Sequence, residues 1–274
     1  MNNSNLGRKL VVFGGNGFLG KRICQIALQS GIFKSIISLS RTGTRPLPAE
    51  GNTKYSPHNW MNKIEWAKAD IFDPKSYEHH LHDTTDVVHS IGILLENSSY
   101  KSIVNGTDKS VLNKVEPSYK KMNTESALVL GETFQNTLKH RSSNGADFDP
   151  LSSTLTYISA DNWSPLIPKG YLESKREAEW QLSRFKPNLF RPIFMRPGIM
   201  YDENARQSFN VRNGIVDILS VLNCTNKLIF QKRFETVNNL IRPPVSTQQV
   251  ARSVISNIEN PRFSGVVPLE KILE

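Results

Sequence analysis

Long apolar runs are missing from this chain of 274 residues. The longest candidate, Val87 to Leu95, is interrupted by His, Ser and Gly and falls well short of the roughly 18 apolar residues that a membrane span needs. Cysteine is also scarce: Cys24 and Cys224 lie far apart and outside any CxxC or CxxH spacing. These absences exclude a spanning helix, a disulfide-stapled mini-domain and a cysteine-based metal centre.

Acidic residues are absent before Glu50, although basic residues occur from Arg8 onward and the formal net charge is +9. A basic start poor in acids is typical of an organelle import signal, so we predict mitochondrion ahead of cytosol. Basic residues form no stripe interleaved with aromatics, so nucleic-acid binding is not predicted. His79, His80 and His82 lack a carboxylate framework, so we predict no metal site.

Strand and helix signals alternate along the chain, which is typical of a parallel sheet covered on both faces. Short apolar runs predict strands at Lys9 to Phe13, Ser35 to Leu39, Lys63 to Ala69, Asp86 to Ser90, Thr154 to Ser159 and Leu189 to Arg196. Helical spacing predicts helices at Phe18 to Gln29, Pro74 to Leu81, Asn123 to His140 and Tyr171 to Phe185, and a loop at Thr42 to Asn62. No shift in composition marks a boundary, so we expect one α/β domain over residues 1–274.

A glycine-rich segment with the spacing Gly14-x-x-Gly17-x-x-Gly20 follows the first expected strand. In dinucleotide-binding loops the first glycine permits a tight turn, the second lets the backbone approach a pyrophosphate, and the third lets the helix pack close to the strand. The N-terminus of that helix then faces the phosphates. Glycines also close ordinary turns, but a strand precedes and a helix follows this triplet, so we predict a dinucleotide site.

The end of the second expected strand, Ser40 and Arg41, indicates which dinucleotide binds. NAD sites usually place Asp or Glu there to bind the ribose 2′-hydroxyl, and neither is present. A guanidinium can pair with a 2′-phosphate through two hydrogen bonds. We therefore predict NADPH in preference to NAD, with a solvated loop arginine as the alternative interpretation.

Two further positions fit the same site. Asp70, at the end of the third strand, could accept a hydrogen bond from the adenine amino group. Its alternative interpretation is a helix N-cap near Pro74, a role that Asp73 fits better. Gly92, just after the fourth strand, would let the cofactor ribose pass close to the backbone.

Tyr171 and Lys175 lie four positions apart, on one face of an expected helix. A neighbouring cation favours the phenolate and so lowers the pKa of a tyrosine, which would let Tyr171 exchange a proton with a substrate oxygen. Ser159, at the end of a strand twelve positions earlier, could hydrogen-bond the same oxygen. Such Tyr/Lys pairs are commonly surface residues, but downstream of a dinucleotide loop this one indicates oxidoreductase chemistry.

Together with Asn123 and the Arg196-Pro197-Gly198 segment, these motifs resemble the short-chain dehydrogenase/reductase superfamily, up to about residue 200. The segment Val12 to Gly20 departs from the usual loop, because Phe13 stands directly before the first glycine, where Thr is expected. This form is similar to the atypical branch that contains the nucleotide-binding accessory subunit of respiratory complex I, most closely its fungal mitochondrial members associated with coenzyme Q biosynthesis. The resemblance implies a Rossmann-like doubly wound parallel sheet with a small C-terminal substrate-side extension over about residues 198–274.

The resemblance also implies a set of site residues. Catalytic roles are expected for Ser159, Tyr171, Lys175 and Asn123, with Asn123 supporting the strand ends or a proton-relay water. Cofactor contacts are expected at Gly14, Asn16, Gly17, Phe18, Leu19, Gly20, Ser40, Arg41, Asp70, Ile71, Gly92, Lys175 and Pro197.

The function implied is an NADPH-dependent oxidoreductase that acts on a hydrophobic quinone precursor or polyprenyl intermediate in ubiquinone biosynthesis. The implied location is the matrix side of the mitochondrial inner membrane, with peripheral membrane contact and other proteins of the ubiquinone-synthesis complex as partners. Two alternatives stay open. One is a non-catalytic nucleotide-binding subunit of that complex; the other is a sugar-nucleotide epimerase, although an epimerase usually retains NAD and the acid that Arg41 replaces.

Overall fold

The computed structural model describes residues 7–46, 57–93, 118–143, 152–162, 167–185, 189–203 and 242–274. Its centre is a sheet of seven strands in the order β3-β2-β1-β4-β5-β6-β9, and every adjacent pair is parallel. The strands are β1 (Arg8–Phe13), β2 (Phe33–Ser40), β3 (Glu65–Lys68), β4 (Asp86–His89), β5 (Thr154–Ile158), β6 (Arg191–Met195) and β9 (Gly265–Val267). The expected Rossmann-like α/β fold is confirmed.

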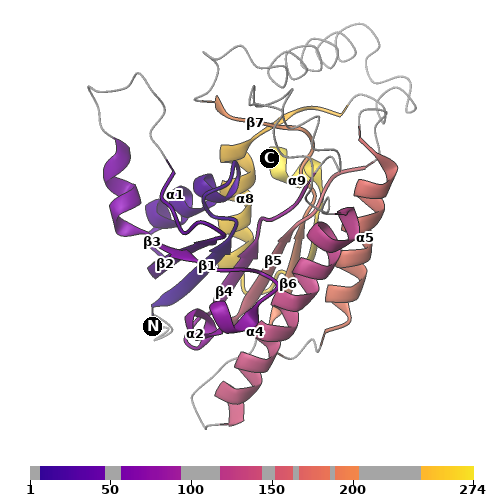
Figure 1. Cartoon of the computed structure of the whole chain (residues 1–274). Helices are drawn as coiled ribbons and strands as arrows, with labels where there is room; N and C mark the ends of the chain where they lie inside the picture. Colours follow the sequence, from indigo (N-terminus) through magenta and orange to yellow (C-terminus); the bar gives the residue numbers. More distant parts are fainter. Residues whose placement is uncertain are drawn as a thin grey trace, which may run out of the picture.

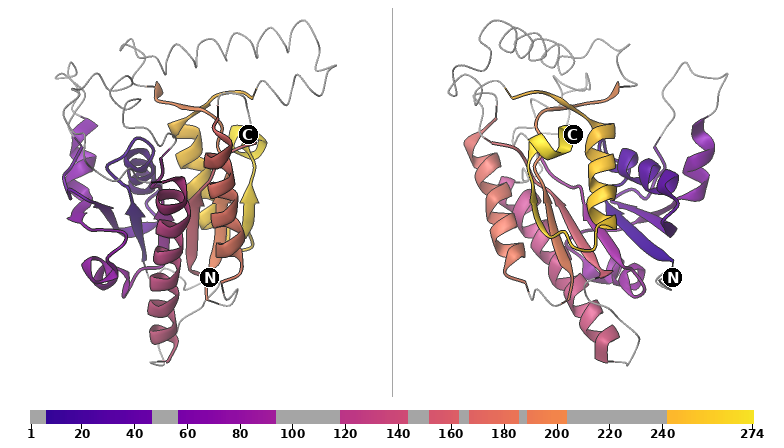
Figure 2. Two further views of the ribbon diagram at one scale, coloured as in Figure 1. Left: turned by 45° about the vertical axis from the view of Figure 1, so that its right-hand side comes forward. Right: turned by 180° about the vertical axis from the view of Figure 1, so that it is seen from behind.

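Helices cover both faces of this sheet (Figures 1 and 2). One face carries α1 (Gly20–Ser30) and α8 (Thr247–Glu259), and the other carries α2 (Glu78–Leu81), α4 (Ser126–Ser143) and α5 (Lys169–Ser183). The remaining elements are the 3-10 helices η1 (Pro57–Lys63) and η2 (Pro74–Ser76), the π-helix η3 (Lys120–Glu125), the short helix α9 (Leu269–Leu273), and a two-stranded sheet of β7 (Met200–Tyr201) and β8 (Val245–Ser246).

The alternation of side chains along β1 shows why the sheet needs two helical layers. Leu10 and Val12 pack into the apolar cluster under α1 and α8, whereas Val11 and Phe13 pack into the cluster under α4 and α5. All four side chains are 1% exposed or less. A parallel strand buried on both faces has no polar alternation, which is what the continuous apolar run at this position predicts.

The expected elements differ from the observed ones mainly at short segments. The expected loop at Thr42 to Asn62 includes the start of η1, and the helix expected from Asn123 starts as a π-helix and becomes α-helical at Ser126. The sequence analysis did not include β9, which has three residues and begins at Gly265 with φ +111°. A strand of three residues is too short to show the hydrophobic periodicity that identifies strands in a sequence.

The chain reverses its direction across the sheet between β1 and β4, because β2 and β3 lie on one side of β1 and the later strands lie on the other. In open parallel sheets ligands bind at such a switch point, beyond the carboxyl ends of the strands. Gly14, Arg41, Gly92 and Ser159 each follow one of these strand ends. The fold therefore gathers the sequence-predicted site residues at one edge.

The C-terminal part of the chain contributes to this core, because β9 pairs with β6 and α8 packs beside α1. Helix α8 begins with a capping box in which Ser246 and Gln249 bond each other's backbone N–H groups. Residues 204–241, about half of the expected substrate-side extension, lie outside the described residues. The single domain and its extension therefore stay predictions.

Candidate active site

The glycine loop is held by main-chain contacts. Gly14 has φ +79°, a conformation that favours glycine, and its N–H donates to the Leu39 carbonyl at 2.8 Å. A Cβ added at Gly20 would lie 2.1 Å from the Gly14 oxygen, so only glycine lets α1 approach this closely. At Gly17, which is exposed, an added Cβ would meet a single atom of the described residues within 4 Å, the Gly14 oxygen at 3.0 Å. The loop thus leaves its outer side open for a ligand.

The N-terminus of α1 faces this loop and suits an anion. Within the fully described helix Gly20–Ser30, the first turn holds no acidic residue and no side chain caps the N-terminal amides. Two cations follow at once: Arg22 bonds Asp202 at 3.1 Å, and Lys21 lies 3.8 Å from the same carboxylate. The helix dipole stabilises negative charge at such a position.

A tight turn after β2 carries Arg41. The Gly43 N–H donates to both the carbonyl and the hydroxyl oxygen of Ser40, at 3.3 and 3.1 Å, and Gly43 has φ +65°. Asn16 of the glycine loop donates to the Thr42 hydroxyl at 3.3 Å, which fastens the turn to the loop. Arg41 is exposed and, among the described residues, makes no hydrogen bond or ion pair. The turn that carries Arg41, unpaired among the described residues, is therefore fastened to the glycine loop.

Asp70 follows β3 and is exposed. Its carboxylate accepts from the Phe72 N–H at 3.0 Å, which closes a local turn of the kind Asp commonly makes. Asp73 precedes η2 and makes no side-chain cap there. The N-cap position of η2 is therefore that of Asp73, as expected, but no capping bond forms there, and the N-cap interpretation of Asp70 is wrong. The Asp70 side chain lies at the sheet edge, engaged by its own loop.

Four other sequence-predicted contacts lie in different surroundings. Leu19 and Ile71 are both 5% exposed and pack into the apolar clusters, so only their backbone can reach a ligand. Phe18 is half-buried in the loop. Pro197 follows β6, and its carbonyl accepts from the Asp161 N–H at 2.9 Å.

Gly92, Asn123 and Lys175 come together from three elements. A Cβ on Gly92 would lie 2.9 Å from Lys175 Nζ and 3.0 Å from Asn123 Oδ1. Asn123 is fully buried: its Oδ1 accepts from the Ile93 N–H at 3.1 Å, and its Nδ2 donates to Ser174 Oγ at 3.0 Å. These bonds join the segment after β4, the π-helix and α5 at one point.

Lys175 is 3% exposed, and its Nζ donates to the Ile158 carbonyl at 2.8 Å. Burial lowers the pKa of Lys175 to about 7, although the charge of Glu179 opposes this. Among the described residues no carboxylate forms an ion pair with Lys175. A buried lysine whose Nζ has one hydrogen-bond acceptor among the described residues is an unusual structural element and a good ligand group.

Tyr171 lies one turn before Lys175, with its ring edge against Tyr119 at 6.1 Å between centroids. Burial raises the pKa of Tyr171 to about 12, and the charge that opposes this most is that of Arg176. The expectation that Lys175 lowers this pKa is wrong, because burial outweighs every nearby charge. Lys175 Nζ lies over the Tyr171 ring, 5.8 Å from its centroid. At neutral pH Tyr171 is therefore a protonated phenol.

Ser159 follows β5 and has a partner that the sequence analysis missed. Arg176 donates to Ser159 Oγ at 3.1 Å, to the carbonyls of Ala160 and Asp161 at 2.9 and 3.1 Å, and to Glu179 at 2.9 Å. The Ser159 oxygen accepts this bond, so its own O–H is left to donate elsewhere. The spacing of Arg176 and Glu179, three apart on one helix, could have indicated their ion pair but not the bond to Ser159.

The same side of the site contains a chain of ion pairs. Glu179, 5% exposed, also binds Arg196 through both carboxylate oxygens. Asp161 is bound by both ends of the Arg242 guanidinium, and Arg242 pairs with Glu270 of α9 at 2.7 Å. These contacts fasten the strand ends after β5 and β6 to the C-terminal segment.

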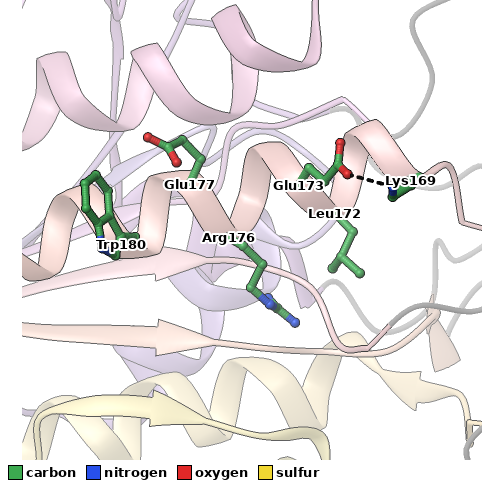
Figure 3. Close-up of a pocket in the computed structure, with 6 residues that line it drawn as sticks. All are labelled: Lys169, Leu172, Glu173, Arg176, Glu177 and Trp180. Carbon is green, nitrogen blue, oxygen red and sulfur yellow. Dashed lines mark ion pairs between the residues drawn. The ribbon is translucent and has the colours of Figure 1, made fainter.

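An open groove of about 930 Å³ runs along α5 (Figure 3). Trp180, 55% exposed, lies at one end of it, with the Arg184 guanidinium 4.4 Å from its ring centroid. Arg176 links the groove to Ser159, but none of the glycine-loop residues line it. Its lining residues are Lys169, Leu172, Glu173, Arg176, Glu177 and Trp180.

The described part of the chain holds no cluster of three or more His, Cys, Asp or Glu side chains that could bind a metal ion. It also holds no helix long and apolar enough to cross a membrane.

No family model matches this chain. It is 45% identical to "MIOREX complex component 2" of Saccharomyces cerevisiae over 282 residues, covering 97% of this chain and 99% of the yeast protein. It is also 27% identical to an uncharacterized chloroplastic protein of Arabidopsis thaliana, covering 97% of this chain and 76% of that protein.

Solved structures share the fold at low sequence identity. An oxidoreductase of the short-chain dehydrogenase/reductase family from Burkholderia thailandensis has a TM-score of 0.58 at 12% identity, covering 98% of this chain and 94% of that one. UDP-glucose 4-epimerase of Thermus thermophilus in complex with NAD has 0.54 at 18%, covering 95% and 77%. A short-chain dehydrogenase from Burkholderia cenocepacia in complex with NADP has 0.52 at 14%, covering 98% and 92%. With the fold of nucleotide-binding short-chain dehydrogenase/reductases and 45% identity along nearly its whole length, the chain belongs to the family of yeast MIOREX complex component 2.

Proposed function

We propose that this protein is an NADPH-dependent oxidoreductase of the atypical short-chain dehydrogenase type that acts in mitochondrial ubiquinone biosynthesis. The observation that carries the proposal is Lys175, a buried ammonium that donates to one carbonyl and has no carboxylate partner among the described residues. Burying such a charge is costly unless it binds something. A nicotinamide ribose would supply the missing acceptors.

The residues at the strand ends fit a nicotinamide cofactor. The cradle formed by Gly14, Gly17 and Gly20 has no room for side chains on its inner side, which suits the close approach of a pyrophosphate. Arg41, which has no partner among the described residues, would hold the 2′-phosphate, and Asp70 the adenine. The cofactor would supply the hydride.

The protonation states of this chain's own residues favour reduction of a substrate. Since burial raises the pKa of Tyr171 to about 12, its phenol holds a proton at neutral pH and can donate it to a substrate oxygen as that oxygen gains charge. Ser159 would donate to the same oxygen, because Arg176 already occupies its acceptor side. Both donors suit a carbonyl or quinone oxygen that becomes a hydroxyl.

The family supports the proposed partners in part. The yeast relative is named as a component of a complex, which supports membership of a multi-protein assembly for this chain. We place the protein in the mitochondrion, on the matrix side of the inner membrane with peripheral contact, among other proteins of the ubiquinone-synthesis complex. A hydrophobic quinone precursor is the proposed substrate.

A second candidate function is a nucleotide-binding subunit without turnover. Two observations favour it. A pKa of about 12 is too high for Tyr171 to give and take a proton repeatedly near neutral pH, and Ser159 is engaged by Arg176, which is itself paired with Glu179. In this case the nucleotide would stabilise the fold, and no proton would move.

Calorimetric titration with NADPH and NADH tests the cofactor. Arg41→Ala removes the charge proposed to bind the 2′-phosphate and should weaken NADPH by about 1.5–3 kcal/mol while leaving NADH unchanged. Lys34→Ala, at the other end of β2, is the matched charge control and should change neither. Equal loss for both nucleotides in Arg41→Ala would contradict NADPH selectivity.

Turnover is tested in cells that depend on this protein for ubiquinone. Tyr171→Phe keeps the ring packing against Tyr119 but removes the proton, and acid–base assistance is commonly worth about 10²–10⁴ in rate. The variant should bind NADPH normally yet fail to restore ubiquinone at matched protein abundance. Full restoration would reject the oxidoreductase and leave the nucleotide-binding subunit, for which Gly17→Val should still impair function by blocking the nucleotide.

A further inference from the structure

Tyr157 lies beneath the proposed site and contacts two of its residues at once. It belongs to β5, two positions before Ser159, so both side chains point to the same face of the sheet. Tyr157 is fully buried, and its hydroxyl donates to the Asn123 carbonyl at 2.8 Å. That bond fastens the π-helix carrying Asn123 to the central sheet.

The ring of Tyr157 also faces the Lys175 ammonium. Lys175 Nζ lies 4.8 Å from the centre of this ring, closer than its 5.8 Å from the ring of Tyr171. The carbonyl of the next residue, Ile158, accepts the hydrogen bond from the same Nζ. Two successive residues of β5 therefore hold the lysine, one through an aromatic face and one through a carbonyl.

A histidine on the neighbouring strand supports Tyr157 from the side. His89 pairs with Tyr157 in the register of β4 and β5, and the two ring centroids are 5.3 Å apart. His89 Nε2 is hydrogen-bonded to Ser126 Oγ at 2.9 Å. Burial lowers the pKa of His89 to about 3, so this ring is uncharged near neutral pH and adds no positive charge beside Lys175.

We propose that Tyr157 is a positioning residue that seats the Lys175 ammonium for its contact with the nicotinamide ribose. The proposal deepens the proposed function and rests on it only for the identity of the ribose. The fixed length of the tyrosine, anchored at Asn123, places an electron-rich ring under Nζ in a region where water cannot solvate the charge.

The other titratable groups near Lys175 do not account for the position of its ammonium over the Tyr157 ring. His89 on β4 is neutral, and Tyr171 on the same helix as Lys175 is protonated, because burial shifts both away from charge. Glu179, one turn further along α5, is the acid whose charge raises the pKa of Lys175, and it is bound by Arg176 and Arg196. Neither ion pair of Glu179 involves Tyr157, so substitutions at Tyr157 should leave both pairs in place.

The experiment measures how readily Lys175 is acetylated by a short pulse of acetic anhydride in nucleotide-free protein, between about pH 5 and pH 10. Mass spectrometry of the peptide gives the titration midpoint. Tyr157→Leu removes the aromatic face and should lower the midpoint by about 0.5–1.5 pH units. Tyr157→Phe keeps the face, loses the bond to Asn123, and should titrate close to wild type.

Phe134→Leu is the matched control, because Phe134 is a fully buried aromatic of the same apolar cluster that belongs to α4. It creates a comparable cavity, so its stability loss should resemble that of Tyr157→Leu while the Lys175 midpoint stays at the wild-type value. Equal midpoints in Tyr157→Leu and Phe134→Leu would overturn the proposal. So would a shift in Tyr157→Phe as large as that in Tyr157→Leu.

NADPH calorimetry at pH 7 provides the second measurement. Tyr157→Leu should bind NADPH at least several-fold more weakly than Phe134→Leu, and equal affinities would reject a role of this seat in cofactor binding. A wild-type protein that binds no NADPH would contradict the proposed function, whereas the nucleotide-free titration of Lys175 would still decide whether Tyr157 seats it.

Discussion

Different kinds of interaction hold the two sides of the proposed site. The nucleotide side, formed by the glycine loop after β1 and the Ser40–Gly43 turn, is held mainly by main-chain bonds such as Gly14 N–H to Leu39 carbonyl. The reactive side, formed by the segments after β5 and β6 with α5, is held by ion pairs around Glu179. Backbone geometry fixes the first, and charge pairing fixes the second.

This difference determines how substitutions on each side should lower the stability of the protein. On the nucleotide side a methyl group added at Gly20 or Gly43 collides with backbone atoms, which cannot move aside as the end of a side chain can. On the reactive side the loss of one carboxylate leaves two partly buried guanidinium groups without their partner. Steric damage should therefore exceed electrostatic damage.

The largest effect is expected at Gly20. A Cβ there would lie 2.1 Å from the Gly14 oxygen and 2.7 Å from Gly15 Cα, so α1 cannot keep its position on the loop. Gly20→Ala should lower the free energy of unfolding by more than about 4 kcal/mol, the range reserved for severe core damage. Urea unfolding followed by circular dichroism measures this.

The control is the same substitution at the other end of the same helix. Gly31 ends α1 at φ +71°, and an added Cβ there would meet nothing within 4 Å. Gly31→Ala should therefore cost only the left-handed backbone strain, about 1–2 kcal/mol. Similar losses at both glycines would mean that α1 does not pack on the loop as described.

The same contrast explains what could be predicted from the sequence. The spacing of Gly14, Gly17 and Gly20 encodes a local backbone shape, so the loop and the strand and helix around it were predictable. The four-residue spacing of Tyr171 and Lys175 placed both on one helix for the same reason. Both predictions needed only residues that are close in the sequence.

The rest depends on residues that are distant in the sequence. Nothing local indicates that Arg176 donates to Ser159, or that Arg242 pairs with Asp161, because these contacts arise only when α5 and the segment before β8 meet the residues after β5. The pKa of Tyr171 was predicted in the wrong direction because burial cannot be read from a helical spacing. Networks of side chains that are distant in the sequence could therefore not be predicted from it.

An intermediate effect is expected at Glu179. Glu179→Ala leaves Arg176 and Arg196 without their shared carboxylate and should lower the free energy of unfolding by about 3–4 kcal/mol, as for other broken buried pairs. Glu177→Ala is the control, since Glu177 is an exposed acid of the same helix, and it should change stability by less than about 0.5 kcal/mol. If Glu179→Ala lost as much free energy of NADPH binding as free energy of unfolding, nucleotide binding would depend on the ion pairs of the reactive side.

The smallest effect is expected at His89, where the two sides meet, and it depends on pH. The pKa of His89 is lowered to about 3 in the folded protein, against about 6.5 when unfolded, so protonation favours unfolding. Stability should be unaffected above about pH 6.5 and should fall as the pH decreases, reaching a loss of about 2 kcal/mol at pH 5.

His89→Phe keeps an aromatic ring beside Tyr157 but cannot titrate, so it should remove this part of the acid-dependent loss. His82→Ala, which removes an exposed histidine, should leave the pH dependence unchanged. Urea unfolding of the three proteins at pH 7, 6 and 5 makes the comparison. Only a buried imidazole resists protonation down to a pKa of about 3. An equally steep fall of stability with pH in His89→Phe and wild type would therefore mean that water reaches His89, which lies beside Tyr157 under Lys175.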